Sequence, residues 1–221
     1  MLILESFFQD ILQSTITLFV VLHPFAAIPF FQGLTSGATE SQKRTIAKKS
    51  AIIVFILLIV FAYLGDAILM ALHITLNDVM IAGGIFIIVF AVKDVATDDY
   101  EVKTAPSRRT SVGLPEAVVD RIAVVPIAIP LLAGPGAIAT VMVLNDLGYA
   151  TYRGPFDFST ALAVVINSLA IWLLLSLSSR LSRVVKPSIL IVLGKVMDIL
   201  MGAIGVSYLV KGAAGILGLN L

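Results

Sequence analysis

The stretch VPIAIPLLAGPGAI, residues 125–138, decides the fold of this chain. It is uncharged and apolar, yet Pro126, Pro130 and Pro135 interrupt it. A proline lacks the backbone N–H and clashes with the carbonyl group one turn back, so a regular helix cannot run through all of them. In lipid, the freed backbone groups cost several kcal/mol each unless they find partners. The stretch therefore predicts a broken helix that faces protein or water rather than acyl chains.

The composition of the whole chain is that of a polytopic membrane protein. Of its 221 residues, 59% are hydrophobic and 13% are charged, whereas a soluble chain carries about 25% charged residues. So few charges cannot cover the surface of a soluble enzyme. The absence of cysteine excludes a disulfide scaffold, and a net charge of +1 excludes a nucleic-acid binder held by bulk charge. The acidic N-terminus, with Glu5 and Asp10, does not resemble a cleaved signal peptide.

Charge-free segments predict six membrane-spanning helices, because a span needs about 20 apolar residues. The expected spans are residues 11–31, a helix centred on 50–65, 79–92, 122–145, 158–179 and 188–210. Thr39 and Gln42 have the spacing of a capping box, in which each side chain caps the other residue's backbone N–H. The second helix is therefore expected to begin near residue 40.

Basic residues are distributed unevenly between the connections. Twelve of the 15 Lys and Arg residues follow the first, third or fifth span, and two fall in the other connections and termini. The positive-inside rule puts the basic side in the cytoplasm. We expect a multi-pass protein of the cell membrane with both termini extracytoplasmic. Residues 94–121 are interpreted as a cytoplasmic linker between two halves, 1–93 and 122–221, with a regulatory or docking segment as the alternative.

The motif P-x-x-A-x-P occurs twice, at residues 24–29 and 130–135, about half the chain apart. The two copies lie in the first and fourth spans, so each half holds three spans and the second half enters the membrane from the opposite side. Many secondary transporters are built on this plan. The fold class predicted is an all-α membrane protein of six transmembrane helices, arranged as a 3+3 inverted-topology repeat with broken first and fourth helices. The alternative for each proline is a kink whose freed groups are satisfied by neighbours.

Three stretches together resemble the MarC family of integral membrane proteins. They are Pro24 to Phe31 in the first span, Ile81-Ala82-Gly83-Gly84-Ile85 in the third, and the stretch 125–138 in the fourth. The resemblance covers nearly the whole chain and implies a transporter of small neutral amino acids such as glycine and alanine. The family motif usually has an acidic residue before the first proline, where this chain has His23. A histidine can carry a proton near neutral pH, but it cannot supply a hard anionic ligand for Na⁺.

Broken helices offer both groups that a zwitterionic amino acid needs. Free N–H groups at the start of one half-helix suit the carboxylate, and freed carbonyl groups at the end of another suit the ammonium group. We expect alternating access around these breaks, with H⁺ or Na⁺ as the coupling ion. The predicted substrate-binding residues are His23, Pro24, Ala26, Ala27, Pro29, Pro130, Ala133, Gly134, Pro135 and Gly136.

Several polar residues inside the spans have two interpretations each. His23 is a candidate for proton coupling beside the site, or a histidine hydrogen-bonded to a neighbouring carbonyl group. Lys195 and Asp198 lie one helical turn apart and form a structural pair, or mark a pathway. Asn167 and Ser168 join helices or line a path. The glycines of the third and sixth spans are expected to allow close helix packing: Gly83, Gly84, Gly202 and Gly205.

The sequence gives no basis for catalysis. It holds no metalloprotease or phosphate-binding motif, and His23 and His73 do not form a zinc site by their spacing. We expect no enzyme activity, no metal, no cofactor apart from the coupling ion and no nucleic-acid partner. The expected partners are a small neutral amino acid and the lipid bilayer, and a homo-oligomer stays open. The alternatives are a non-transporting scaffold or stress-linked membrane protein, with its breaks packed shut, and a passive small-solute pore.

Overall fold

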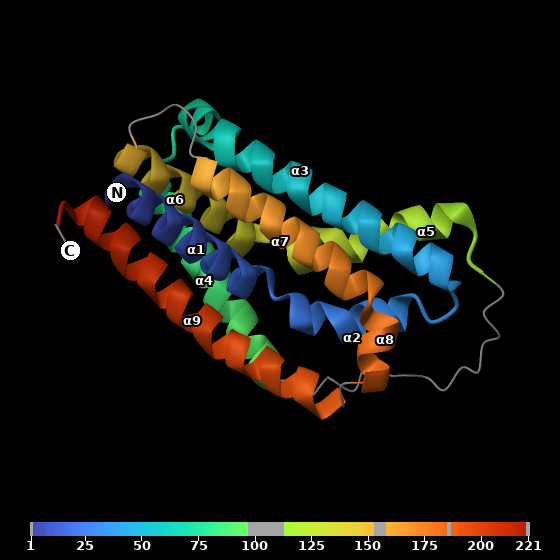
Figure 1. Cartoon of the computed structure of the whole chain (residues 1–221). Coiled ribbons are helices and arrows are strands. Elements are labelled where there is room, and N and C mark those ends of the chain that lie inside the picture. Colours follow the sequence, from blue (N-terminus) through green and yellow to red (C-terminus); the bar gives the residue numbers. More distant parts are fainter. Residues whose placement is uncertain (1, 97–112, 153–157, 185–186, 220–221) are drawn as a thin grey trace.

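The computed structural model describes residues 2–96, 113–152, 158–184 and 187–219, and every regular element in these ranges is a helix (Figure 1). Five helical segments are long and apolar enough to cross a membrane: Phe7–Leu34, Glu40–Leu72, Leu76–Ala96, Phe158–Ser176 and Ile189–Leu217. They coincide with five of the expected spans. The remaining expected span, the fourth, is divided, and its apolar helix Pro135–Leu147 is shorter.

The elements follow one another along the chain as a series of long helices joined by short ones. They are α1 (Leu2–Leu22), α2 (Pro24–Leu34), α3 (Glu40–Leu72), α4 (Leu76–Ala96), α5 (Glu116–Ile122), the π-type helix η1 (Ala123–Leu132), α6 (Pro135–Tyr152), α7 (Phe158–Ser176), α8 (Ser178–Val184) and α9 (Pro187–Leu217). Within the residues read from the sequence as a linker, the last part forms α5, and α4 runs on to Ala96.

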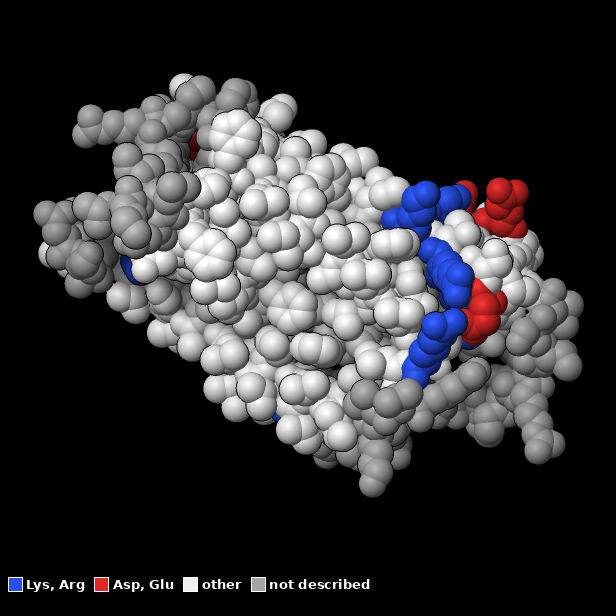
Figure 2. Space-filling view, viewed as in Figure 1, with Lys and Arg blue, Asp and Glu red and all other residues white. Residues whose placement is uncertain are grey.

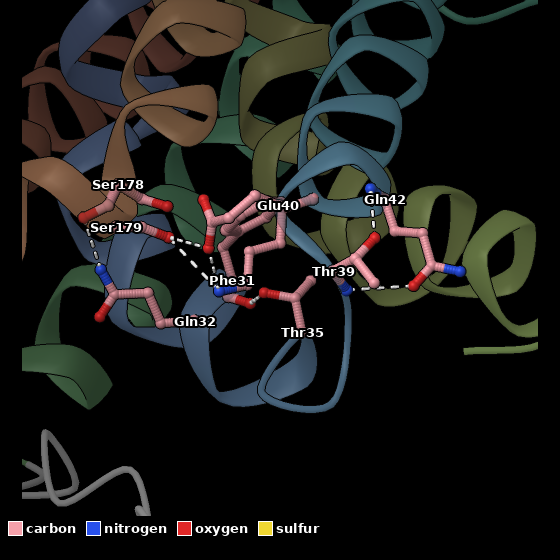
Figure 3. A network of polar contacts seen from close by, with 9 residues as sticks. Phe31, Gln32, Thr35, Thr39, Glu40, Gln42, Ser178 and Ser179 are labelled. Carbon is pink, nitrogen blue, oxygen red and sulfur yellow. Dashed lines mark hydrogen bonds and ion pairs between the residues drawn. The ribbon is translucent and has the colours of Figure 1, made fainter. Parts of the chain in front are cut away.

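The expected capping box sets the start of α3. Thr39 Oγ1 accepts a hydrogen bond from the Gln42 N–H at 3.2 Å, and Gln42 Oε1 accepts one from the Thr39 N–H at 3.1 Å (Figure 3). The Gln42 amide also binds Leu114, donating to its carbonyl oxygen at 2.7 Å and accepting from its N–H at 2.9 Å. The cap therefore also holds the chain segment that leads into α5.

Glycines bring α4 into close contact with α9 and α6. A Cβ added to Gly84 would lie 2.6 Å from the Gly205 carbonyl oxygen, and one added to Gly205 would lie 2.9 Å from that of Gly84. A Cβ on Gly83 would lie 2.3 Å from Ala139 Cβ. The expected role of these glycines is confirmed. At Gly202 the contact is ordinary, since its added Cβ would lie 3.8 Å from the nearest atom, on α4.

The surface divides into a charged end and an apolar body. In Figure 2, most of the visible Lys and Arg side chains form a band near one end, together with a few carboxylates. The start of α3, α5 and α8 lie at this end, whereas α1 begins and α9 finishes at the opposite end (Figure 1). Exposed Ile56, Val89, Leu169 and Ile199 project from the long helices between the ends. This is the distribution expected of a lipid-facing surface.

Two polar contacts fix the helices on either side of the first break. On α7, Asn167 Nδ2 donates to the Thr15 carbonyl oxygen of α1 at 3.2 Å, so the expected joining role of Asn167 is confirmed. At the charged end, Gln32 Nε2 of α2 donates to the Ser178 carbonyl oxygen of α8 at 2.9 Å (Figure 3). In the same network, Ser179 Oγ donates to Glu40 Oε1 at 3.3 Å. α1 is thus tied to α7, and α2 is tied to α8.

Candidate functional site

The first break falls on a single residue, His23, between α1 and α2. Its backbone is left-handed, with φ 50° and ψ 50°, a conformation that is uncommon for a residue with a side chain. Pro24 follows in the first turn of α2, and helical geometry is disfavoured for a residue before proline. The His23 N–H still donates to the carbonyl oxygens of Phe19 and Val20, both at 3.2 Å. The first span is therefore broken as expected, but it bends at one residue instead of unwinding over several.

The second break is longer and lies in the apolar stretch of residues 125–138. Val125 (φ −130°, ψ 123°) and Ile129 (φ −130°, ψ 124°) are extended, and each directly precedes a proline. Ala133 leaves the helix with φ −100° and ψ 60°, and α6 begins at Pro135 after Gly134. Segment η1 contains the first two of these departures, and its first residue is held to α3, because Ser50 Oγ donates to the Ala123 carbonyl oxygen at 3.0 Å.

The two copies of P-x-x-A-x-P agree at their first proline and differ at their second. His23 and Ile129 both leave helical geometry directly before the first proline. Before the second proline, Ile28 stays in α2 and Pro29 lies inside that helix, whereas Gly134 belongs to no helix. The difference explains why the second break is the more open one.

A cavity of about 320 Å³ lies between the two breaks. Val21 and Phe30 line it from either side of the first break, and Gly134, Pro135 and Gly136 line it from the second. Aromatic residues of α4, Phe86 and Phe90, complete the wall. Because these side chains are apolar, the polar groups offered to a ligand here come from the backbone.

Helix ends supply those backbone groups. Gly136 and Ala137, which line the cavity, lie in the first turn of α6, where N–H groups have no acceptor within the helix. Val21 lies in the last turn of α1, where the carbonyl groups of Phe19 and Val20 accept from the His23 N–H and those of Val21 and Leu22 have no donor within the helix. The cavity thus lies between the positive end of one helix dipole and the negative end of another. That arrangement suits a small molecule with opposite charges at its two ends.

Only part of the predicted substrate-binding set lines this cavity, namely Gly134, Pro135 and Gly136. Five other members are buried and do not line it: His23, Pro24, Ala26, Ala27 and Ala133. Pro29 is half-buried in α2. Pro130 belongs to η1, and its side chain lies outside the described part of the chain. Ala27 and Ala133 pack in the main hydrophobic core. Their small size therefore serves helix packing in this conformation.

His23 faces two carboxylates that the sequence did not connect with it. Its Nε2 lies 3.8 Å from Asp94 Oδ2 of α4, and its Nδ1 lies 3.5 Å from Asp198 Oδ1 of α9. The side chains of His23 and Asp198 are 3% and 0% exposed. The His23 ring centre is 6.5 Å from that of Phe90, which lines the cavity. The cluster is therefore adjacent to the cavity and lies at the first break.

One expectation about His23 is wrong, and the expected pair of Lys195 and Asp198 is not hydrogen-bonded. Lys195 does not hydrogen-bond to Asp198, since neither oxygen of the Asp198 carboxylate has a hydrogen-bond partner among the described residues. Its ammonium group donates instead to the carbonyl oxygens of Asp94 and Val95, the latter at 3.0 Å, near the C-terminal end of α4, where a helix dipole favours a cation. His23 is not hydrogen-bonded to a neighbouring carbonyl group, because both of its ring nitrogens lack a partner there. Its role in proton coupling stays a prediction.

Spacing along the chain could not reveal the cluster. The ligand-type atoms come from three separate parts of the sequence, and only the fold brings them within 4.8 Å of one another. The one available signal was that Asp198 is an ionisable residue inside an apolar segment, a feature that usually marks a functional position.

The fold and the site define a multi-pass helical membrane protein whose spans are interrupted around a buried polar cluster. The chain belongs to the MarC family of integral membrane proteins, whose model matches residues 8–217. The resemblance seen in its proline and glycine motifs is thus confirmed.

Several relatives match the chain, two of them over about nine tenths of its length. The chain is similar to the UPF0056 membrane protein YhcE of Escherichia coli (30% identical over 201 residues, 91% of this chain and 90% of the relative). It is also similar to the UPF0056 membrane protein MJ1677 of Methanocaldococcus jannaschii (34% over 206 residues, 91% and 94%). A third relative is YvbG of Bacillus subtilis (35% over 138 residues, 62% and 64%). These names describe membrane proteins and state no activity. No solved structure matches the chain.

Proposed function

We propose that the protein is a secondary transporter of small neutral amino acids, of the size of glycine and alanine. The observation that carries the proposal is the cavity of about 320 Å³ between the last turn of α1 and the first turn of α6. A zwitterion needs donors for its carboxylate and acceptors for its ammonium group, and both are available there without any ionised side chain. The substrate class itself comes from the family resemblance.

In the binding mode proposed, the N–H groups of Gly136 and Ala137 hold the carboxylate of the amino acid. Carbonyl groups in the last turn of α1 hold its ammonium group. Close approach of the substrate to the backbone requires small residues, which Gly134 and Gly136 provide. The apolar wall formed by Phe86 and Phe90 accepts the hydrogen or methyl side chain.

We also propose that the helices form a 3+3 inverted-topology repeat that moves by alternating access. In support, α1 packs on α7 while α3 packs on η1 and α6. A twofold axis that exchanges the two halves of the chain would convert the contact of α1 with α7 into the contact of η1 and α6 with α3. The same axis would map two further pairs, α4 with α9 and α3 with α7, onto themselves. The reciprocal contact of Gly84 with Gly205 fits this axis. Rocking of the halves about it would open the cavity to each side in turn.

The test is uptake of labelled glycine by proteoliposomes that contain the protein, with counterflow driven by unlabelled glycine or alanine. Saturable uptake that both amino acids inhibit is expected under an imposed H⁺ or Na⁺ gradient. Uptake that rises linearly with concentration would indicate a pore instead. No flux under any gradient would leave a non-transporting scaffold as the better description.

A pair of glycine variants connects the flux to the cavity. In Gly136→Ala, the added Cβ would lie 2.6 Å from Ile87 Cγ1, so the Ile87 side chain must move at the cavity wall. We expect a several-fold higher half-saturating glycine concentration. Gly37→Ala is the control, because its Cβ would make an ordinary 3.5 Å contact with Leu114, outside the cavity lining. Equal transport by Gly136→Ala and wild type would place the substrate elsewhere.

A further inference from the structure

We propose that His23, Asp94 and Asp198 form a binding site for a divalent transition-metal ion. The site joins the first break to α4 and α9 and adjoins the cavity. The proposal is independent of amino-acid transport, since it rests on the geometry of these three side chains alone.

Both distances in the cluster are longer than a hydrogen bond, and the one between His23 and Asp198 is close to that of neighbouring ligand atoms around one ion. His23 Nδ1 is 3.5 Å from Asp198 Oδ1, and His23 Nε2 is 3.8 Å from Asp94 Oδ2. Hydrogen bonds between nitrogen and oxygen end at about 3.2 Å. Around a tetrahedral zinc ion, with bonds of about 2.0–2.2 Å, neighbouring ligand atoms lie about 3.4 Å apart. One ion binds only one imidazole nitrogen, so Asp94, which lies nearest Nε2, must turn toward Nδ1 to complete the site. One ligand atom from each of the three residues lies within 4.8 Å of the others, so this side-chain movement is small.

The burial of unpartnered polar atoms is a second, independent observation. Both ring nitrogens of His23 and both carboxylate oxygens of Asp198 lack a hydrogen-bond partner in the described structure. These residues are 3% and 1% exposed. Buried polar groups are almost always partnered, because their lost hydration must be replaced. A cation between them would be the partner of both side chains.

The chemistry of the donors selects the class of ion. An imidazole nitrogen suits Zn²⁺, Co²⁺, Ni²⁺ and related ions, whereas Mg²⁺ and Ca²⁺ prefer oxygen ligands throughout. The two carboxylates together neutralise the charge of one divalent ion. The ammonium group of Lys195, which is bound to the carbonyl oxygens of Asp94 and Val95, would repel a second ion. The Asp94 side chain is 26% exposed, which gives an ion a route to the site.

Ligation would also account for the strained backbone at the break. His23 has φ 50°, and a residue with a side chain keeps such a conformation only where its surroundings fix it. A metal held by Asp94 and Asp198 would fix the imidazole and, through it, the junction of α1 and α2. The ion would thereby lock the break in the conformation seen here.

The test is metal binding by the full chain, purified in detergent, with Co²⁺ as the probe. A site with one imidazole and two carboxylates should give visible absorption bands that saturate at one Co²⁺ per chain and disappear when Zn²⁺ is added. Asp198→Asn and His23→Gln keep the size of the side chain, and each should weaken binding by more than about tenfold. His73→Asn is the control, because it removes the other histidine, whose left-handed backbone asparagine accepts.

A second measurement on the unmodified protein keeps the test decisive if a variant does not fold. Zn²⁺ should raise its melting temperature by mass action, and a chelator should reverse the shift. The proposal is overturned if the wild type shows neither the Co²⁺ bands nor the thermal shift, or if folded Asp198→Asn and His23→Gln bind Co²⁺ like wild type. It is equally overturned if Na⁺ alone gives the thermal shift. None of these outcomes depends on whether glycine is transported.

Discussion

At His23 the backbone is left-handed while the side chain is buried and faces carboxylates from α4 and α9. Histidine is one of the residues with a side chain that are found in the left-handed region more often than most, although it stays uncommon there. The resemblance to the family implies an acidic residue at this position, where the chain has His23. In this chain the carboxylates beside this position belong to Asp94 of α4 and Asp198 of α9, which the fold brings next to His23.

At the same scale, Asn167 shows how much one buried amide contributes in an apolar protein. Its Nδ2 donates to the Thr15 carbonyl oxygen of α1 at 3.2 Å and to the Ala163 carbonyl oxygen of its own helix at 2.8 Å. Asn167→Ala should lower the free energy of unfolding by about 0.6–1.7 kcal/mol, the range of hydrogen bonds between helices in membranes.

Denaturation of the detergent-solubilised protein, followed by circular dichroism, measures this loss. Leu169→Ala on the same helix is the control, because its side chain is half exposed and contacts the lipid side. An equal loss in both variants would mean that the amide contributes only through its volume.

Among the elements, α4 and α9 depend on the absence of side chains where they meet. In Gly84→Ala the new Cβ would lie 2.6 Å from a backbone oxygen of Gly205, which cannot rotate away. The helices must therefore separate, and we expect a loss of about 1–3 kcal/mol in the free energy of unfolding.

Gly202→Ala is the matched control on α9, where the new Cβ would make an ordinary contact at 3.8 Å. There the replacement should be neutral or stabilising by up to about 1 kcal/mol, because glycine is the poorer helix former. Both values come from the same denaturation experiment. Similar stability of the two variants would contradict the close approach of α4 and α9.

For the molecule as a whole, the band of charge at one end gives a prediction about its orientation in the membrane (Figure 2). The positive-inside rule places that end in the cytoplasm. The chain has no cysteine, so each introduced cysteine reports its own position. Ser41→Cys, in the first turn of α3, should react with a membrane-impermeant maleimide only after cells are permeabilised. Ile74→Cys, between α3 and α4, should react in intact cells.

A third variant, Leu219→Cys, checks the position of the C-terminus, since Leu219 is exposed beyond the end of α9. It should be labelled like Ile74→Cys. Labelling of Ser41→Cys alone in intact cells would reverse the orientation. Labelling of Leu219→Cys and Ile74→Cys from opposite sides of the membrane would contradict the predicted six spans.

The features that sequence alone predicted are local ones. The capping box at Thr39, the departures before Pro24 and Pro135, and the close packing at Gly84 each follow from a few adjacent residues and from steric rules. The cluster around His23 depended on tertiary packing.

Asp94 and Lys195 illustrate that limit. Asp94 was placed in the linker because charged residues become frequent there, whereas α4 continues to Ala96 and carries Asp94 beside the first break. The spacing of Lys195 and Asp198 allowed a pair on one helix face, but the main-chain oxygens at the end of α4 offered Lys195 a better partner. Such competition between neighbours in space cannot be judged from one helix alone.

The attachment of α1 to α7 through Asn167, and of α2 to α8 through Gln32, has a mechanical consequence. α1 and α2 meet at His23, and α7 and α8 meet at Leu177. The two hydrogen bonds therefore connect the helix pair on either side of His23 with the helix pair on either side of Leu177. Because each helix of one pair is hydrogen-bonded to a helix of the other, a change in the angle at one joint must either break one of these bonds or change the angle at the other joint. A bend that starts in the first half of the chain is thereby transmitted to the second half, and the connected joints act as a linkage rather than as two independent hinges.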